Sequence, residues 1–138
     1  MKNYLSKSVM TLACLTACLT LVLVPAPVNA QGSQVAMTIR VNPVTASPGG
    51  TVGVFAFVTN TSGARLRTTA TISSLSPCGI ETNLGYNKLV LNPGQTVQVT
   101  VSYPLAPDAC LGTYAVSISV SSGKNAAVSS TTAYLTVQ

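Results

Sequence analysis

Apolar and polar residues alternate with a period of two along most of the chain after residue 34, and clusters of Gly, Pro, Asn and Ser interrupt the alternation. This pattern predicts half-buried β-strands joined by turns, because successive side chains of a strand point to opposite faces. No run shows the 3.6-residue period of an amphipathic helix. The predicted strands cover residues 35–41, 51–59, 64–73, 88–91, 95–103, 113–121 and 126–137.

The apolar positions within each run define the face that we expect to be buried, as in the alternation of Val52, Val54, Ala56 and Val58. Residues 74–87 are the least regular stretch and are predicted to form a loop. About seven short antiparallel strands in roughly a hundred residues predict one all-β domain, an immunoglobulin-like β-sandwich. Asn60 with the next two residues fits the N-glycosylation pattern, but we interpret it as a turn at a strand end.

The first thirty residues differ in kind from the rest. Two lysines precede an uncharged run from Val9 to Val24, two prolines follow it, and small residues stand at the positions expected before a cut after Ala30. This order is typical of a secretory signal peptide, and the apolar run is shorter than the roughly 20 residues of a membrane span. We therefore expect residues 1–30 to be a signal peptide cleaved between Ala30 and Gln31, and residues 31–138 to be the exported domain. Lipidation of Cys18, within a lipobox-like sequence, is the alternative.

Removal of the leader would leave Cys78 and Cys110 as the last two cysteines. In an oxidising compartment two remaining cysteines usually pair, so a disulfide is expected. Two buried free thiols or a metal site are the alternatives, although a metal needs about four ligands and the chain has no His.

The composition argues against catalysis and against nucleic-acid binding. Without His there is no His-based triad, and Glu81 and Asp108 are the only carboxylic side chains available for acid–base chemistry. A disulfide between Cys78 and Cys110 would bring the segments of these two acids together, but both are interpreted as turn residues. Beyond residue 30 the net charge is +3, from five basic and two acidic residues, and the basic residues are scattered singly. We expect no enzyme, no cofactor, no metal and no nucleic-acid partner.

Three stretches resemble bacterial extracellular immunoglobulin-like modules, among them the cell-adhesion-related domain found in bacteria (CARDB) and the β-sandwich module of some secreted glycosidases. These stretches are 42–63, with Ser47-Pro48-Gly49-Gly50, 91–101, with Asn92-Pro93-Gly94, and 106–116, with Gly112-Thr113-Tyr114. The resemblance implies a sandwich in which Pro-Gly turns and a Gly-x-Tyr sequence open strands. It also implies a non-catalytic spacer or adhesive role, although here the domain follows the leader without a catalytic neighbour and the cysteine pair is not general in those families.

Tyr114 stands at the start of a strand after a long loop. In immunoglobulin-like sandwiches such a Tyr often forms a corner, with its hydroxyl bonded to the backbone a few residues upstream. We expect the partner between Pro104 and Asp108.

These observations predict a secreted or periplasmic, non-catalytic binding or structural module without a stable membrane span. Its partner, a protein or a cell-envelope polysaccharide, and its oligomeric state are left open. A subunit of a surface or fimbrial assembly is one alternative. A protease inhibitor that presents the disulfide-anchored loop 76–86 is another.

Overall fold

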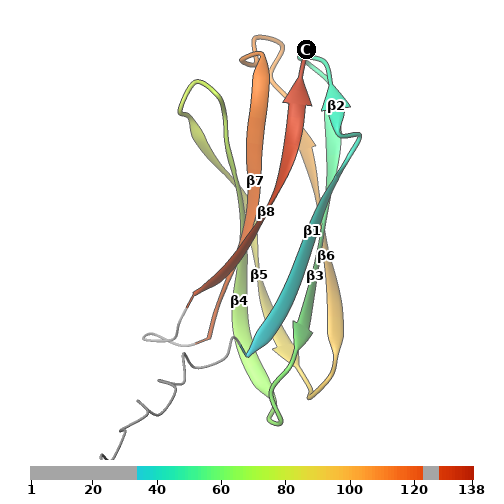
Figure 1. The fold of residues 1–138 in the computed structure, drawn as a ribbon, viewed down its shortest axis with the longest axis vertical. Helices are drawn as coiled ribbons and strands as arrows, with labels where there is room; N and C mark the ends of the chain where they lie inside the picture. The colour runs from blue at the N-terminus through green and yellow to red at the C-terminus, as the bar shows by residue number, and fades with distance from the viewer. Residues whose placement is uncertain (1–33, 123–127) are drawn as a thin grey trace, which may run out of the picture.

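The structure, a computed structural model, describes residues 34–122 and 128–138. Within them, two β-sheets pack face to face (Figure 1), which confirms the predicted all-β, two-layer architecture. The strands run in antiparallel β1-β3-β6 and mixed β2-β8-β7-β4-β5 sheets. Their bounds are β1 Val35–Asn42, β2 Thr45–Ala46, β3 Thr51–Asn60, β4 Leu66–Leu75, β5 Glu81–Leu91, β6 Thr96–Pro104, β7 Gly112–Ser121 and β8 Ser129–Val137. The predicted leader, its cleavage site and the start of the last predicted strand lie outside the described residues.

The chain changes sheets soon after its first strand. β1 pairs antiparallel with β3, and after the cis Asn42–Pro43 bond the two-residue β2 joins the other sheet, where it runs parallel to β8. The expectation of about seven strands, all antiparallel, is wrong at this point. A strand of two residues is too short to show a period, so the alternation of the sequence could not predict it.

The core lies between the sheets and is made by the inward side chains of each strand. Val52, Val54, Ala56 and Val58 of β3 are fully buried, as predicted, and face the other sheet. Their counterparts on β4, β7 and β8 include Ala70, Ile72, Val116, Ile118 and Leu135. The same alternation directs two hydroxyl side chains of β4, Thr68 and Ser74, into this core, where their oxygens have no hydrogen-bond partner among the described residues.

β5 begins seven residues earlier than the predicted strand 88–91, so most of the predicted loop is a strand. The first part of this strand was not predicted because it contains a β-bulge. Gly85 pairs with Ile72, Asn83 pairs with Ser73, and Leu84 is an extra residue between them. An extra residue breaks the period of two that identifies a strand in a sequence. Gly85 has a φ of 150°, a region that side-chain-bearing residues rarely adopt, so a Gly suits this position of the bulge.

Asn60, at the end of β3, holds the β3–β4 turn and the end of β5 together. Its fully buried side-chain amide donates to the carbonyl oxygens of Ala64 and Leu91 at 2.8 and 3.1 Å, and its Oδ1 accepts from the Ser62 backbone N–H and hydroxyl at 2.9 and 2.7 Å. All of its hydrogen-bonding capacity is therefore used within the fold. The Asn60 turn confirms the interpretation of this sequence as a strand end.

Replacement of Asn60 by Asp is expected to destabilise the domain strongly. The carboxylate would face two carbonyl oxygens that lose their donors, and a buried unsatisfied group costs about 1–3 kcal/mol, more when it is charged. Urea unfolding of Asn60→Asp and of the exposed Asn87→Asp measures the difference. The Asn87 variant should stay within about 0.5 kcal/mol of the parent, and equal losses in both variants would contradict the role given to Asn60.

Candidate functional site

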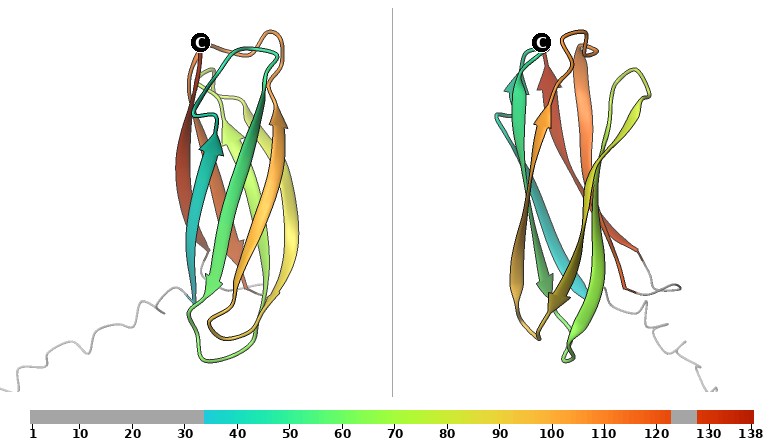
Figure 2. Two further views of the ribbon diagram at one scale, coloured as in Figure 1. Left: turned by 90° about the vertical axis from the view of Figure 1, so that its right-hand side faces the viewer. Right: turned by 180° about the vertical axis from the view of Figure 1, so that it is seen from behind.

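The end of the sandwich that carries the C-terminus also carries the disulfide. Figure 2 shows the β4–β5 turn, the β6–β7 loop and the C-terminus together at this end, which we call the disulfide end. Cys78 of the turn and Cys110 of the loop are joined there, with their Cα atoms 6.3 Å apart, so the structure contains the expected pair. The bond fastens the turn of an edge hairpin to the segment that crosses between the sheets.

Backbone hydrogen bonds and one close contact order the disulfide end further. Gly49 donates to Ala106 at 3.0 Å and Leu105 donates to Gly50 at 2.8 Å, so the turn before β3 is attached to the β6–β7 loop. Gly112 opens β7 with a φ of 126°, and a Cβ built there would lie 3.2 Å from the Pro77 ring. Gly112 in the Gly-x-Tyr sequence therefore admits both the backbone conformation and the neighbouring turn.

Tyr114 is buried below these loops, with 3% of its surface exposed. Burial, followed by the neighbouring Tyr103, raises the pKa of Tyr114, and a hydrogen bond with the backbone of Cys110 acts in the opposite direction. The backbone of Cys110 is therefore the neighbour of Tyr114 that fits the predicted corner, and it lies outside the range Pro104 to Asp108 in which we expected the partner. Cys110 stands two residues before β7, so the step from this backbone group to Tyr114 is shorter than we expected.

A small hollow of about 180 Å³ lies beside Tyr114 at this end. Asp108 contributes to its lining and Glu81 does not, so the hollow does not gather the two carboxylic side chains that acid–base catalysis would need. Within residues 34–122 and 128–138, no group of three or more Cys, Asp or Glu side chains could hold a metal ion. The same residues contain no helix long and apolar enough to cross a membrane.

The β4–β5 turn is also shorter than the loop 76–86 that we expected. Residues 81–86 belong to β5, and only Ser76–Ile80 connects the strands. Within this turn the Ser76 N–H donates to the Ile80 carbonyl and the Gly79 N–H donates to the Ser76 carbonyl, both at 2.9 Å. The turn is closed by hydrogen bonds within itself, whereas recognition by strand addition uses an extended segment. This difference counts against the use of the turn as an inhibitory loop.

The outer face of the five-stranded sheet is rich in hydroxyl groups. Its cross-strand rows follow from the register: Tyr86, Thr71, Ser119 and Ser130 form one row, and Asn83, Ser73, Ser117 and Thr132 form the next. Ser117 and Thr132 share a hydrogen bond of 2.8 Å across the strands. Tyr86 on β5 ends the first row, and Tyr134 on β8 lies one row beyond the second. Both side chains are about two-thirds exposed, and they are separated by three strand spacings across the sheet, roughly 14 Å, and by four residues along it, roughly 13 Å.

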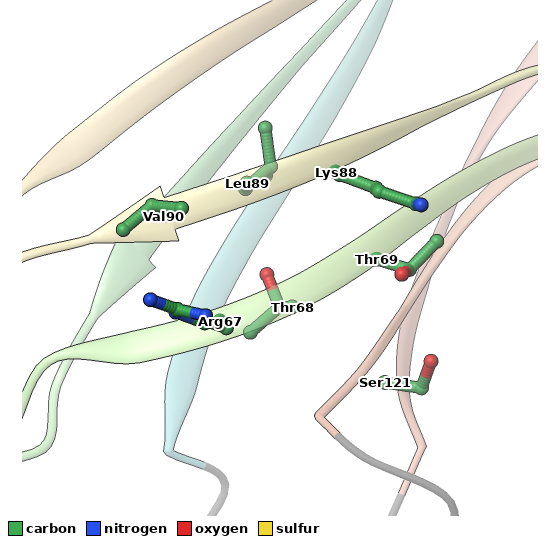
Figure 3. Close-up of a pocket in the computed structure, with 7 residues that line it drawn as sticks. All are labelled: Arg67, Thr68, Thr69, Lys88, Leu89, Val90 and Ser121. Carbon is green, nitrogen blue, oxygen red and sulfur yellow. The ribbon is translucent and has the colours of Figure 1, made fainter.

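A larger hollow of about 400 Å³ lies over β4 and β5 (Figure 3). Arg67 lies beside Val90 on the neighbouring strand, and Lys88 lies opposite Thr69. Sequence reasoning missed both the hollow and the rows of hydroxyl groups because each depends on which residues of neighbouring strands lie side by side. The alternation of Ser and Thr with apolar residues was the available signal, and it predicted only that they face outward.

Comparison with solved structures shows the fold. The CARDB domain of a Pyrococcus furiosus protein, determined in complex with di-metal ions, has a TM-score of 0.60 and 14% identity, over 77% of this chain and 90% of that domain. A β-glucosidase from Erythrobacter marinus has a TM-score of 0.56 and 15% identity, over 75% of this chain and only 15% of the enzyme. The sporulation control protein Spo0M of Bacillus subtilis has a TM-score of 0.51 and 12% identity, over 76% of this chain and 49% of that protein.

The predicted resemblance to CARDB and glycosidase-associated sandwiches is confirmed as a likeness of fold. The CARDB domain is matched over nearly its whole length, whereas the match to the β-glucosidase is confined to a small part of that chain. No protein-family model and no curated protein sequence matches the chain.

Replacement of both Cys78 and Cys110 by Ala is expected to lower the free energy of unfolding by roughly 3.5–4 kcal/mol, because the bond closes a loop with a sequence separation of 32. Urea unfolding measures the loss. The parent, denatured in an alkylating agent without reductant, should take up no label and should weigh two hydrogens less than the reduced form. Labelling of both thiols in the parent would contradict the pairing.

Replacement of Tyr114 by Phe is expected to cost about 1–2 kcal/mol, since it removes a buried hydrogen bond, whereas Tyr134→Phe at the exposed site should cost less than about 0.5 kcal/mol. The raised pKa of Tyr114 adds a pH dependence. Its stabilising contribution is complete below the unfolded-state pKa of about 10 and is lost as the pH rises through the higher folded-state value. The advantage of the parent over Tyr114→Phe in urea should therefore narrow above about pH 10, and a widening advantage would contradict the account.

Proposed function

We propose that this protein is an exported, non-catalytic binding module that recognises a polysaccharide of the cell envelope through the outer face of its five-stranded sheet. The disulfide supports an oxidising compartment outside the cytoplasm, because such bonds are rare where thiols are kept reduced. The likeness to a CARDB domain over most of that domain supports a module without catalysis. The leader predicted from the sequence supports export.

One observation carries the choice of surface: two exposed Tyr rings lie at diagonally opposite corners of ordered rows of Ser and Thr hydroxyls on a single sheet face. A hydroxyl group both donates and accepts, as the hydroxyls of a sugar do, so the two surfaces can exchange hydrogen bonds in either direction. A Tyr ring offers an apolar face with a polar tip, which suits the mixed surface of a sugar ring. The cores of protein–protein interfaces are more apolar than this face.

Retention of the purified domain, residues 31–138, on polysaccharide extracted from the envelope of the source cells tests this function. Tyr134→Ala is expected to weaken retention by roughly ten-fold, because the exposed ring is a main contact. Val44→Ala is the matched control, since Val44 is 65% exposed, against 66% for Tyr134, and lies outside the hydroxyl rows.

Retention of the parent with equal weakening by both substitutions would place the binding surface elsewhere. The absence of retention on polysaccharide from any envelope fraction would overturn the proposed function.

A further inference from the structure

Among the strands of residues 34–122 and 128–138, β5 has a neighbour on one side only. It is the last strand of the β2-β8-β7-β4-β5 sheet, and it pairs with β4 along its whole length. Antiparallel neighbours alternate between pairs that exchange hydrogen bonds and pairs that do not. Since the Ser76 N–H donates to the Ile80 carbonyl, the alternation directs the backbone groups of Glu81 and Asn83 away from β4. Beyond the bulge the same alternation directs those of Tyr86 and Lys88 to the open edge.

The β4–β5 hairpin also concentrates exposed apolar side chains. Eight large hydrophobic residues are exposed among the described residues, and half of them lie on this hairpin: Leu75, Ile80, Tyr86 and Val90. Apolar side chains gathered along an unpaired edge favour contact with another strand.

The charges of β5 fit a particular partner. Its two charged residues, Glu81 and Lys88, are seven positions apart, and in a regular strand an odd separation puts side chains on opposite faces. The extra residue at Leu84 changes this, because Glu81 lies opposite Leu75 and Lys88 opposite Thr69, two positions of β4 on the outward face. The bulge therefore brings an acid and a base to the same face of one edge strand.

A second copy of β5 laid antiparallel along this edge can match these charges twice. The register that sets Glu81 opposite Lys88 of the second copy also sets Asn83 opposite Tyr86, and the two-fold axis then passes between Leu84 and Gly85. In this register, facing residues share a face of the sheet and direct their backbone groups toward each other. Ile80, which is exposed in the single chain, comes to lie across from Leu89 of the second copy.

We propose that two copies of the domain associate edge to edge through β5, so that their five-stranded sheets form one continuous sheet. A lone Lys on an edge strand discourages pairing with another strand. Here Glu81 of the second copy lies opposite Lys88, so the charge of the Lys is paired. The contact is isologous, so it closes at two copies. A single strand pair is a small interface, so the dimer is weak and forms with rising concentration. Dimerisation would also place two hydroxyl-rich faces side by side, which favours multivalent binding.

Sedimentation velocity over about a hundred-fold range of concentration tests the dimer. The parent is expected to pass from monomer to dimer and to stop there. Glu81→Lys and Lys88→Glu should each weaken the dimer by about ten-fold or more, because each change replaces two opposite-charge pairs by two like-charge pairs. Arg65→Glu, on the β3–β4 turn and outside β5, is the control with the same change of charge as Lys88→Glu, and it should dimerise as the parent does.

An equimolar mixture of the two single variants provides the sharper result. One chain then carries two lysines at positions 81 and 88 and the other carries two glutamates, so a mixed dimer regains both charge pairs. The mixture should dimerise to within about three-fold of the parent, although each variant alone dimerises about ten-fold or more weakly. Circular dichroism of each variant confirms that it is folded.

Three outcomes would overturn the proposal: a parent that stays monomeric throughout, variants that dimerise as the parent does, or a mixture that stays monomeric. Growth beyond two copies would also overturn it and would favour an open surface assembly. None of these results depends on binding of polysaccharide, so the dimer and the proposed function fail separately.

Discussion

Burial of alternate side chains between two sheets is the constraint on which the rest of the structure depends. The inward residues of β3, from Val52 to Val58, are fully buried because β4, β7 and β8 cover them from the other sheet. Because successive side chains of a strand point to opposite faces, the neighbours of each inward apolar residue point outward. The outward Ser and Thr side chains therefore form the opposite face of the sheet that covers the core. The outer surface could then be used for binding without altering the interior, since Ser117 and Ile118, for example, are adjacent in sequence but face opposite ways.

The bulge in β5 changes which residues of this strand point inward and which point outward. Leu84 packs against the core while Gly85 continues the pairing, and beyond them the outward positions shift by one residue. Both ends of β5 are fastened to other parts of the fold: the Cys78–Cys110 bond holds the turn before it, and the Asn60 amide holds the carbonyl of Leu91 at its end. A strand with fixed ends and an open edge is well suited to receive another strand, because little conformational freedom is lost on pairing. The disulfide and Asn60 therefore contribute to the position of the edge as well as to stability.

Much of the fold could be predicted from the sequence, because a strict period of two over many residues identifies a strand. Examples are the runs from Val52 to Val58 and from Tyr114 to Val120. The disulfide partners could be predicted because only two cysteines follow the predicted leader. Three features could not be predicted. β2 is too short to have a period, the bulge at Leu84 interrupts the alternation in the first half of β5, and the backbone neighbour of Tyr114 depends on the path of the β6–β7 loop. The hydroxyl rows and the charge match of β5 are properties of register between strands, which a single sequence does not display.

Amide hydrogen exchange measured residue by residue along β5 tests the central claim. This claim is that the bulge makes the open edge of β5 complementary to the same edge of a second copy. At low protein concentration, the amides that face β4, such as those of Thr82, Asn87 and Leu89, should be protected, and those of Asn83, Tyr86 and Lys88 should exchange freely. At high concentration the amides of Asn83, Tyr86 and Lys88 should become protected as well. At either concentration, the alternation between amides that face β4 and amides that face the edge should shift by one residue across Leu84. Protection of the second set that does not change with concentration, or an alternation that passes Leu84 without a shift, would contradict the account.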